Sequence, residues 1–175
     1  MPSIGHVAVG LAAARLASST AGIPVPRIRL ALLLSAAALL PDLDAIGFEL
    51  GVPYGAPWGH RGAAHSLVFA AIVGVLVAPL GRQFKLSSAQ LWLWVTCATA
   101  SHGLLDSLTN GGRGIALLWP FTHARFFAPW RPIAVAPLGL RVLSARGVYV
   151  VGQELLLFAP LFIYGLWPRR GNKPS

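Results

Sequence analysis

The chain has 175 residues, of which 55% are hydrophobic and only 11% are charged, and its formal net charge is +9. Soluble domains usually carry about 25% charged residues, so this composition excludes an ordinary soluble domain and favours one domain folded in lipid. The single cysteine, Cys97, excludes an intramolecular disulfide and a cysteine-rich zinc site.

Five apolar segments follow one another along the chain. A membrane helix requires roughly 20 mostly apolar residues. The first candidate, 4–19, is short and contains Arg15, so it either crosses the membrane or lies half-buried against the others. The second carries Pro41, and no segment shows the alternation of a strand. The sequence therefore predicts an all-α fold, a polytopic membrane bundle of about five helices forming one domain over 1–175, with helices at 4–19, 28–48, 63–80, 89–108 and 148–167.

The connections between these segments differ in length and composition. Residues 51–62 are rich in Gly, Pro and aromatics, as an interfacial loop should be, and residues 81–85 are short and basic. Residues 110–146 form a long segment with five arginines, and segments of this length are often functional. The N-terminus has no basic stretch before its apolar run, so we expect no removable signal peptide.

The basic residues indicate a membrane orientation. Short loops dominate the positive-inside rule. One side holds seven basic residues in short loops and the C-terminal tail, so we expect that side to be cytoplasmic. We assign the positive charge to topology and lipid headgroups and expect no nucleic-acid partner, since no basic helix face or binding motif is present. The residues on the cytoplasmic side are Arg27, Arg29, Arg82, Lys85, Arg169, Arg170 and Lys173, and those opposite are Arg61, Arg113, Arg125, Arg131, Arg141 and Arg146.

Nearly all acids and histidines are predicted to meet at one end of the bundle. In an up-and-down topology, odd helices start where even helices end. Ionisable groups at membrane depth are costly and are usually paired or line a polar cavity. Crowded carboxylates repel one another unless they are protonated or neutralised, and Arg61 is the one cation expected nearby. A divalent metal is therefore expected among His6, Asp42, Asp44, His60, His65, His102, Asp106 and Glu154.

The spacing of individual residues agrees with this hypothesis. His102 and Asp106 are one helical turn apart, which suits chelation of one ion. Asp42 and Asp44 would diverge on an ideal helix, although Pro41 can redirect them. One of the two is expected to contact metal while the other orients a histidine. We expect His65 to be a ligand in preference to His60.

Each residue also has a simpler interpretation. A lone histidine is more often a hydrogen-bonded core residue. Asp44 alone is compatible with a helix cap, and Glu154 is compatible with a structural ion pair with Arg141 or Arg146. His123 in the long segment is interpreted as a histidine without a role in the metal site. The tryptophans near the predicted helix ends are expected to be interfacial anchors; they are Trp58, Trp119, Trp130 and Trp167.

Three motifs and their order resemble a known family. PDLD at 41–44, HRGxxHS at 60–66 and SHGLLDSLTNGG at 101–112, with His6 and the LWPF…FFAPWRPI stretch at 118–133, resemble the YdjM-type family of inner-membrane proteins. That family is described as predicted metal-dependent hydrolases, distantly related to zinc-dependent phospholipase C and single-strand-specific zinc nucleases. The resemblance implies metal ligands at His65, His102 and Asp106, completed by Asp42 or Asp44, His6 and Glu154.

The resulting functional hypothesis is a metal-dependent hydrolase of the inner membrane, with its site on the extracytoplasmic side. Zinc is the expected metal, and Mn, Fe or Mg also suit the ligands. The expected substrate is a phospholipid or another phosphate ester. Asp42 or Asp44 would accept a proton from the attacking water, and Arg61 would bind a phosphate oxygen. The alternatives are a metal transporter and a non-catalytic membrane protein with a structural metal.

Overall fold

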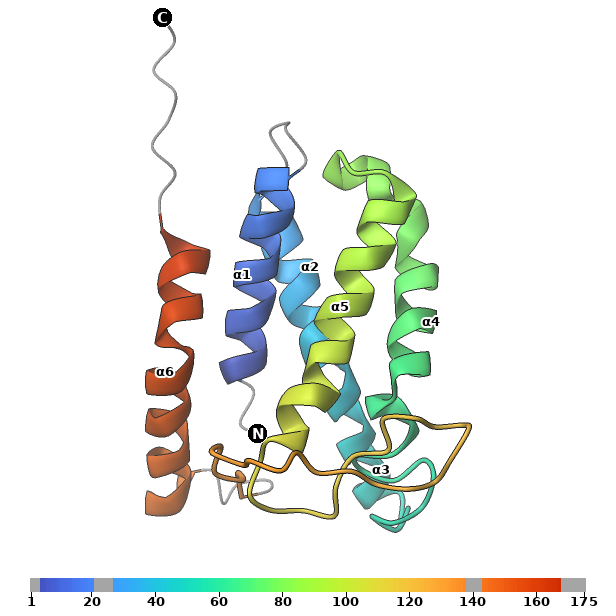
Figure 1. Ribbon diagram of the computed structural model, residues 1–175, viewed down its shortest axis with the longest axis vertical. Coiled ribbons are helices and arrows are strands. Elements are labelled where there is room, and N and C mark those ends of the chain that lie inside the picture. The colour runs from blue at the N-terminus through green and yellow to red at the C-terminus, as the bar shows by residue number, and fades with distance from the viewer. Residues whose placement is uncertain (1–3, 21–26, 138–142, 168–175) are drawn as a thin grey trace, which may run out of the picture.

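The structure, a computed structural model, describes residues 4–20, 27–137 and 143–167. Within these residues five long helices run alternately up and down, and no strand occurs beyond two isolated bridges (Figure 1). The predicted all-α bundle with its His/Asp cluster at one end is therefore confirmed. The elements are α1 (Ile4–Thr20), α2 (Arg27–Leu39), η1 (Leu40–Ala45), α3 (Ile46–Glu49), η2 (Ala63–His65), α4 (Leu67–Val77), η3 (Ala78–Phe84), α5 (Ser88–Ser107) and α6 (Ala145–Leu166).

Three helical stretches of the described chain are long and apolar enough to cross a membrane. They are Arg27–Glu49, Leu67–Phe84 and Ala145–Leu166. The two other long helices fall short of this, because α1 has 17 residues and α5 carries His102 and Asp106 in its last turns. The prediction of a polytopic membrane bundle holds, although fewer segments qualify as complete crossings than the five that were predicted.

Prolines explain where two predicted helices change from α to 3₁₀ geometry. The segment predicted at 28–48 changes from α to 3₁₀ geometry at Leu40, because Pro41 lacks a backbone N–H and cannot continue the helix. Pro79 acts in the same way after α4, so residues 81–84, predicted as a loop, are 3₁₀-helical. The helix predicted to start at residue 148 begins at Ala145, where the Ser144 side chain accepts a hydrogen bond from the Gly147 N–H.

Small residues allow the first two helices to pack closely. Ala8, Ala14 and Ala17 on α1 and Ala37 and Ala38 on α2 are buried. A side chain at Gly10 would overlap the backbone of Ser35 on α2. Such small-residue contacts are typical of helix pairs in membranes. The close approach brings the start of α1 beside the end of α2, where the polar cluster lies.

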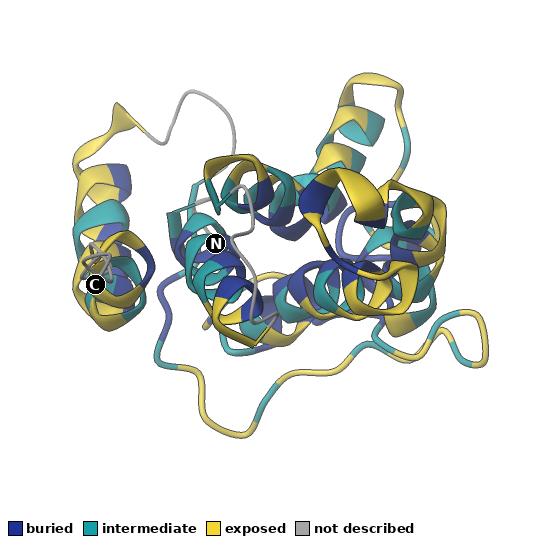
Figure 2. Ribbon diagram, turned by 90° about the horizontal axis from the view of Figure 1, so that it is seen from above, coloured by how far each residue is buried: buried dark blue, intermediate teal, exposed yellow. Residues whose placement is uncertain are grey.

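Helix α6 lies at the edge of the bundle and packs mainly against α1 (Figure 2). Arginines from two other helices secure its C-terminal end. The guanidinium of Arg15 donates to the Trp167 carbonyl, and Arg27 donates to the Gly165 carbonyl at 2.5 Å. These bonds satisfy carbonyls that a helix end leaves without partners. The position of α6 places Glu154 against the first turn of α1.

The long segment after α5 runs across the site end of the bundle (Figure 1). Backbone hydrogen bonds attach it to two helices, from Ala128 N to the carbonyl of Ser107 at the end of α5 at 3.0 Å and from Leu67 N at the start of α4 to Leu117 O at 3.0 Å. A third bond joins Ala116 N to Arg61 O at 3.1 Å. The segment is therefore fixed to the loop that carries His60 and Arg61. Residues 138–142, which include Arg141, lie outside the described residues.

Candidate metal centre

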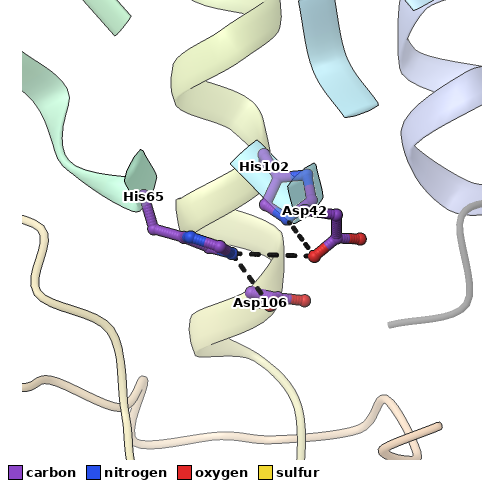
Figure 3. A group of neighbouring side chains, drawn as sticks. All are labelled: Asp42, His65, His102 and Asp106. Atoms are coloured by element: carbon purple, nitrogen blue, oxygen red, sulfur yellow. Dashed lines mark ion pairs between the residues drawn. The ribbon is translucent and has the colours of Figure 1, made fainter. Parts of the chain in front are cut away.

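Four side chains from three elements converge at the site end of the bundle (Figure 3). Asp42 comes from η1, His65 from η2, and His102 and Asp106 from the last turns of α5. Each offers one nitrogen or oxygen atom, and these four atoms lie within 4.8 Å of one another. We call these four residues the four-residue cluster.

His102 is oriented by the backbone of α2. Its Nδ1 lies 2.7 Å from the Ala38 carbonyl oxygen, which can only accept, so Nδ1 carries the proton and donates. Nε2 is then left with its lone pair and lies 3.2 Å from Asp42 Oδ1. A metal-binding histidine commonly has its second ring nitrogen fixed in this way.

His65 shows the same arrangement with a carboxylate as the orienting group. Its Nδ1 lies 3.0 Å from Asp44 Oδ2, and its Nε2 lies 3.8 Å from Asp42 Oδ1 and 3.8 Å from Asp106 Oδ2. His65 precedes the membrane-spanning stretch Leu67–Phe84. Burial alone would lower the pKa of His65, but Asp42 and Asp44 outweigh burial and raise that pKa above its ordinary value.

Asp44 is not one of the four cluster residues, but it contacts one of them and two neighbouring groups. Its Oδ1 accepts from His60 Nδ1 at 2.6 Å, and its Oδ2 accepts from the Arg61 backbone N–H at 3.1 Å while facing His65. Asp42 and Asp44 therefore diverge, as the sequence suggested. Asp42 faces the cluster, and Asp44 lies behind His65. Asp44, His60 and His65 form a second group of potential ligands.

Arg61 contacts the cluster and neutralises one of its carboxylates. The guanidinium Nε is 3.0 Å from Asp106 Oδ2, and Nη1 donates to Thr109 Oγ1 at 3.1 Å and to the Gly111 carbonyl at 2.8 Å. The residue is 2% exposed. The sequence suggested that Arg61 binds a phosphate oxygen. In the structure the guanidinium contacts a buried carboxylate of the cluster, and the phosphate contact stays a prediction.

The cluster is closed on most sides. The side chains of His65 and His102 have no exposed surface and that of Asp106 is 1% exposed, whereas Asp42 is 28% exposed. Asp42 is therefore the member that faces outward. Water or a small ligand would reach the four-residue cluster along the Asp42 side.

His6 and Glu154 lie next to the cluster but do not belong to it. The His6 ring stacks on the His102 ring with centroids 3.8 Å apart, and His6 Nε2 is 4.0 Å from Asp106 Oδ1. Glu154 Oε2 accepts from the Gly5 N–H at 3.2 Å. Within the described residues, both nitrogens of His6 and Glu154 Oε1 are buried without a hydrogen-bond partner. His6 and Glu154 therefore lie at the predicted end of the bundle, but their side chains are not as close to the other ligand atoms as the four cluster residues are to one another.

Local backbone features bring the ligands together. Gly103 follows His102, and a Cβ there would lie 2.5 Å from the His65 carbonyl oxygen, so only glycine lets η2 approach α5 this closely. Ser66 then starts α4 directly after His65, because its side chain accepts from the Phe69 N–H at 3.0 Å. The cluster thus depends on a close approach of backbone to backbone beside its ligands.

The donor set fits a divalent transition metal. Two neutral imidazoles and two carboxylates are ligands that zinc takes in proteins, and they also suit Mn or Fe. Lone pairs on His65 Nε2 and His102 Nε2 face the carboxylates without hydrogen bonds of good geometry. A cation between these atoms would be attracted by both the nitrogen lone pairs and the carboxylates. The structure thus contains a cluster that can hold a metal ion, without fixing which metal.

Sequence reasoning did not identify several supporting groups. The Ala38 carbonyl that orients His102 has no side chain that would mark it. Thr109 and Gly111, which hold Arg61, lie inside the SHGLLDSLTNGG motif but had no assigned role. Gly103 follows His102 directly, and a glycine next to a candidate ligand is a sign of close backbone approach.

The helices and the cluster define a polytopic membrane protein with a candidate metal site. The chain belongs to the YdjM inner membrane protein family, which matches residues 1–170. It is 46% identical to the inner membrane protein YbcI of Escherichia coli (strain K12) over 138 residues, which are 76% of this chain and 80% of that protein. No solved structure matches the chain. These matches confirm the family resemblance and the assignment to an inner membrane.

Proposed function

We propose that the chain is a membrane-bound, metal-dependent hydrolase that cleaves a phosphate ester, with a phospholipid as the leading substrate class. One observation carries the proposal. His65 Nε2 and His102 Nε2 meet two carboxylates, while the other nitrogen of each ring already faces an acceptor. This is the arrangement of metal-binding histidines whose tautomer is fixed in advance.

The roles of the residues follow from their contacts. Asp42, His65, His102 and Asp106 would hold the ion. A divalent metal in such a site activates water near neutral pH and polarises a phosphoryl oxygen. Asp42 is the most exposed of the four, so its second carboxylate oxygen is the group that would accept the proton of the attacking water.

Other residues would prepare the site without touching substrate. Asp44 places a carboxylate 3.0 Å from His65 Nδ1, which favours a proton on that nitrogen, and Arg61 lowers the repulsion between Asp106 and the other carboxylates. In hydrolysis a water oxygen bonds to phosphorus, the ester P–O bond breaks, and the leaving alkoxide takes a proton. The short loop with Arg82 and Lys85 lies at the opposite end of the bundle. Because short loops dominate the positive-inside rule, this supports an extracytoplasmic location despite the arginines of the long segment.

Metal content is the first test. Detergent-purified wild-type protein, prepared without chelator, is compared by mass spectrometry with His102→Ala/Asp106→Ala. The matched control is Glu49→Ala/His123→Ala, which removes an exposed acid and an exposed histidine outside the cluster. Wild type and control should retain near-stoichiometric metal, and the cluster variant should lose it. Absence of metal from wild type, even after incubation with zinc or manganese, would sink the proposal.

Hydrolysis is then measured on bis(p-nitrophenyl) phosphate and on phospholipids in mixed micelles. Wild type should show turnover that a chelator abolishes and that added metal restores. Asp42→Asn should reduce turnover more than it reduces metal content. Equal activity of wild type and His102→Ala/Asp106→Ala would reject the site as the source of activity.

A structural metal site is the second candidate, and the burial of the cluster favours it. Three of its four side chains are 0–1% exposed. In that case a chelator lowers the melting temperature and no phosphate ester is cleaved. A transporter has less support, because every acid and histidine in the described residues lies toward one end of the bundle.

A further inference from the structure

The site end of the bundle carries arginines that the candidate metal centre does not use. Two arginines in this region bind other groups of the protein. Arg61 pairs with Asp106, and Arg125 donates to the carbonyls of Tyr54, Ala56 and His60 at 3.1–3.3 Å. Arg125 therefore attaches the long segment to the loop at 51–62. Because protein groups already occupy these two guanidiniums, neither is available to an external anion.

Three further arginines are exposed and have no hydrogen bond or ion pair in the described parts of the chain. Each lies over an aromatic ring, at a distance typical of a cation–π contact. We call them the arginine triad. They are Arg113, 5.7 Å from the Tyr54 ring centroid, Arg131, 4.9 Å from that of Phe127, and Arg146, 5.7 Å from that of Tyr149.

The aromatic rings attract these guanidiniums, whose central carbons lie 4.9–5.7 Å from the ring centroids, and this contact restricts the motion of each group. A guanidinium edge pairs with phosphate oxygens through two parallel hydrogen bonds. The arginine triad therefore offers three phosphate contacts.

The surroundings of the arginine triad favour lipid over a soluble anion. Glu49 is the one exposed acid in the described chain, so the surface at this end is net positive. Large aromatic side chains also project from it, with Trp58 66%, Phe121 84% and Trp130 73% exposed. Exposed tryptophan and phenylalanine beside arginine are typical of the headgroup level of a membrane. Such a surface suits phosphates that are anchored in a bilayer.

We propose that Arg113, Arg131 and Arg146 bind the phosphate groups of anionic phospholipids in the leaflet next to the candidate metal centre. The binding does not depend on hydrolysis, since none of the three contacts the four-residue cluster. It would hold this end of the protein at the headgroup layer. It would also concentrate anionic lipid in the leaflet next to the cluster.

The test uses the full chain in detergent, titrated with phosphatidylglycerol or phosphatidylcholine, with bound lipids counted by native mass spectrometry. Arg113→Gln/Arg131→Gln/Arg146→Gln removes the triad. Arg29→Gln/Arg82→Gln/Lys85→Gln is the matched control, because it removes three exposed positive charges at the opposite end. Wild type and control should prefer phosphatidylglycerol. Each triad arginine removed should weaken phosphatidylglycerol binding about fivefold, the factor equal to about 1 kcal/mol per basic residue at an anionic surface.

Several outcomes would overturn the proposal. They are an unchanged preference in the triad variant, an equal loss in the control, and displacement of the lipid by inorganic phosphate at matched concentration. The three single substitutions give the same comparison if the triple variant does not fold. Metal content is measured on the same preparations. Loss of the lipid preference with metal retained shows that lipid binding is separate from the metal site of the hydrolase proposal. Loss of metal with the preference retained shows that the metal site can fail while lipid binding persists.

Discussion

His65 Nδ1 lies 3.0 Å from Asp44 Oδ2, on the side of the ring opposite the four-residue cluster. Asp44 also accepts from His60 Nδ1 and from the Arg61 N–H. The carboxylate is thereby held by two groups and in turn holds the ring of His65. A residue two positions from Asp42 therefore supports the cluster through its neighbours His65 and Arg61.

Replacing this carboxylate tests its orienting role. Asp44→Asn leaves all four members of the cluster in place but removes the negative charge behind His65. Loss of such an orienting partner typically costs about 10–100-fold in metal affinity. We expect a loss of that size, measured by competition for zinc with a chromophoric chelator. Glu49→Gln, an exposed carboxylate on α3, is the control and should bind zinc as wild type does. Unchanged affinity in Asp44→Asn would show that Asp44 has no orienting role.

Metal binding should depend on pH through His65. Asp42 and Asp44 raise the pKa of His65, so its proton is held more tightly than that of an ordinary histidine. Only the neutral ring binds metal, so protons compete with the ion. As pH falls, zinc affinity should begin to decrease above about 6.5, the ordinary histidine pKa, by up to about tenfold per pH unit. Equilibrium zinc competition across a pH series measures this. An onset well below that value would contradict the assigned contacts of His65.

Close packing beside His102 should be as important as the ligands. In Gly103→Ala the new methyl group meets the His65 carbonyl oxygen, so the backbone of η2 must move away from α5. Overpacking of this kind typically costs about 1–3 kcal/mol. We expect a lower melting temperature and reduced metal content. Gly152→Ala on α6 is the matched control, because a Cβ there meets nothing within 4 Å. If both variants behave as wild type, η2 has more freedom than the structure implies.

Much of this arrangement was predictable because it follows from spacing. The one-turn separation of His102 and Asp106 places them together on any α-helix. The alternating direction of the helices brings His65 and Asp42 to the same end. These relations need only the helix periodicity and the order of the apolar segments. They therefore hold even where a predicted helix end is wrong by a few residues.

The contacts of Arg61 were not predictable in the same way. Its position depends on a left-handed backbone, with φ of 64°, and on the path of the long segment that supplies Thr109 and Gly111. Neither feature has a periodic sequence pattern. The ranking of His6 below the four-residue cluster also depends on distances of a few ångströms between helices, which spacing along the chain does not determine.

Arg61 should be a stabilising residue as well as a neighbour of the site. Its guanidinium is buried against Asp106, and removal of one partner of a buried pair typically costs about 3–5 kcal/mol. We expect Arg61→Gln to lower the melting temperature strongly in the metal-free protein. Added zinc should recover part of the loss, because the ion would neutralise Asp106 in place of the arginine. A variant as stable as wild type without metal would contradict the assigned pairing.

His6 offers a substitution that separates a ligand from a packing residue. Its ring stacks on His102, has no exposed surface, and has no hydrogen bond at either nitrogen in the described residues. His6→Phe keeps a flat ring in place and removes two unpartnered polar atoms. A buried unpartnered group typically costs about 1–3 kcal/mol, so the metal-free variant should be at least as stable as wild type. If the nitrogens of His6 also serve a bound ion, the same variant should bind less metal. The melting temperature of the metal-free protein measures the first effect and zinc content measures the second. Unchanged metal content would assign His6 to packing alone.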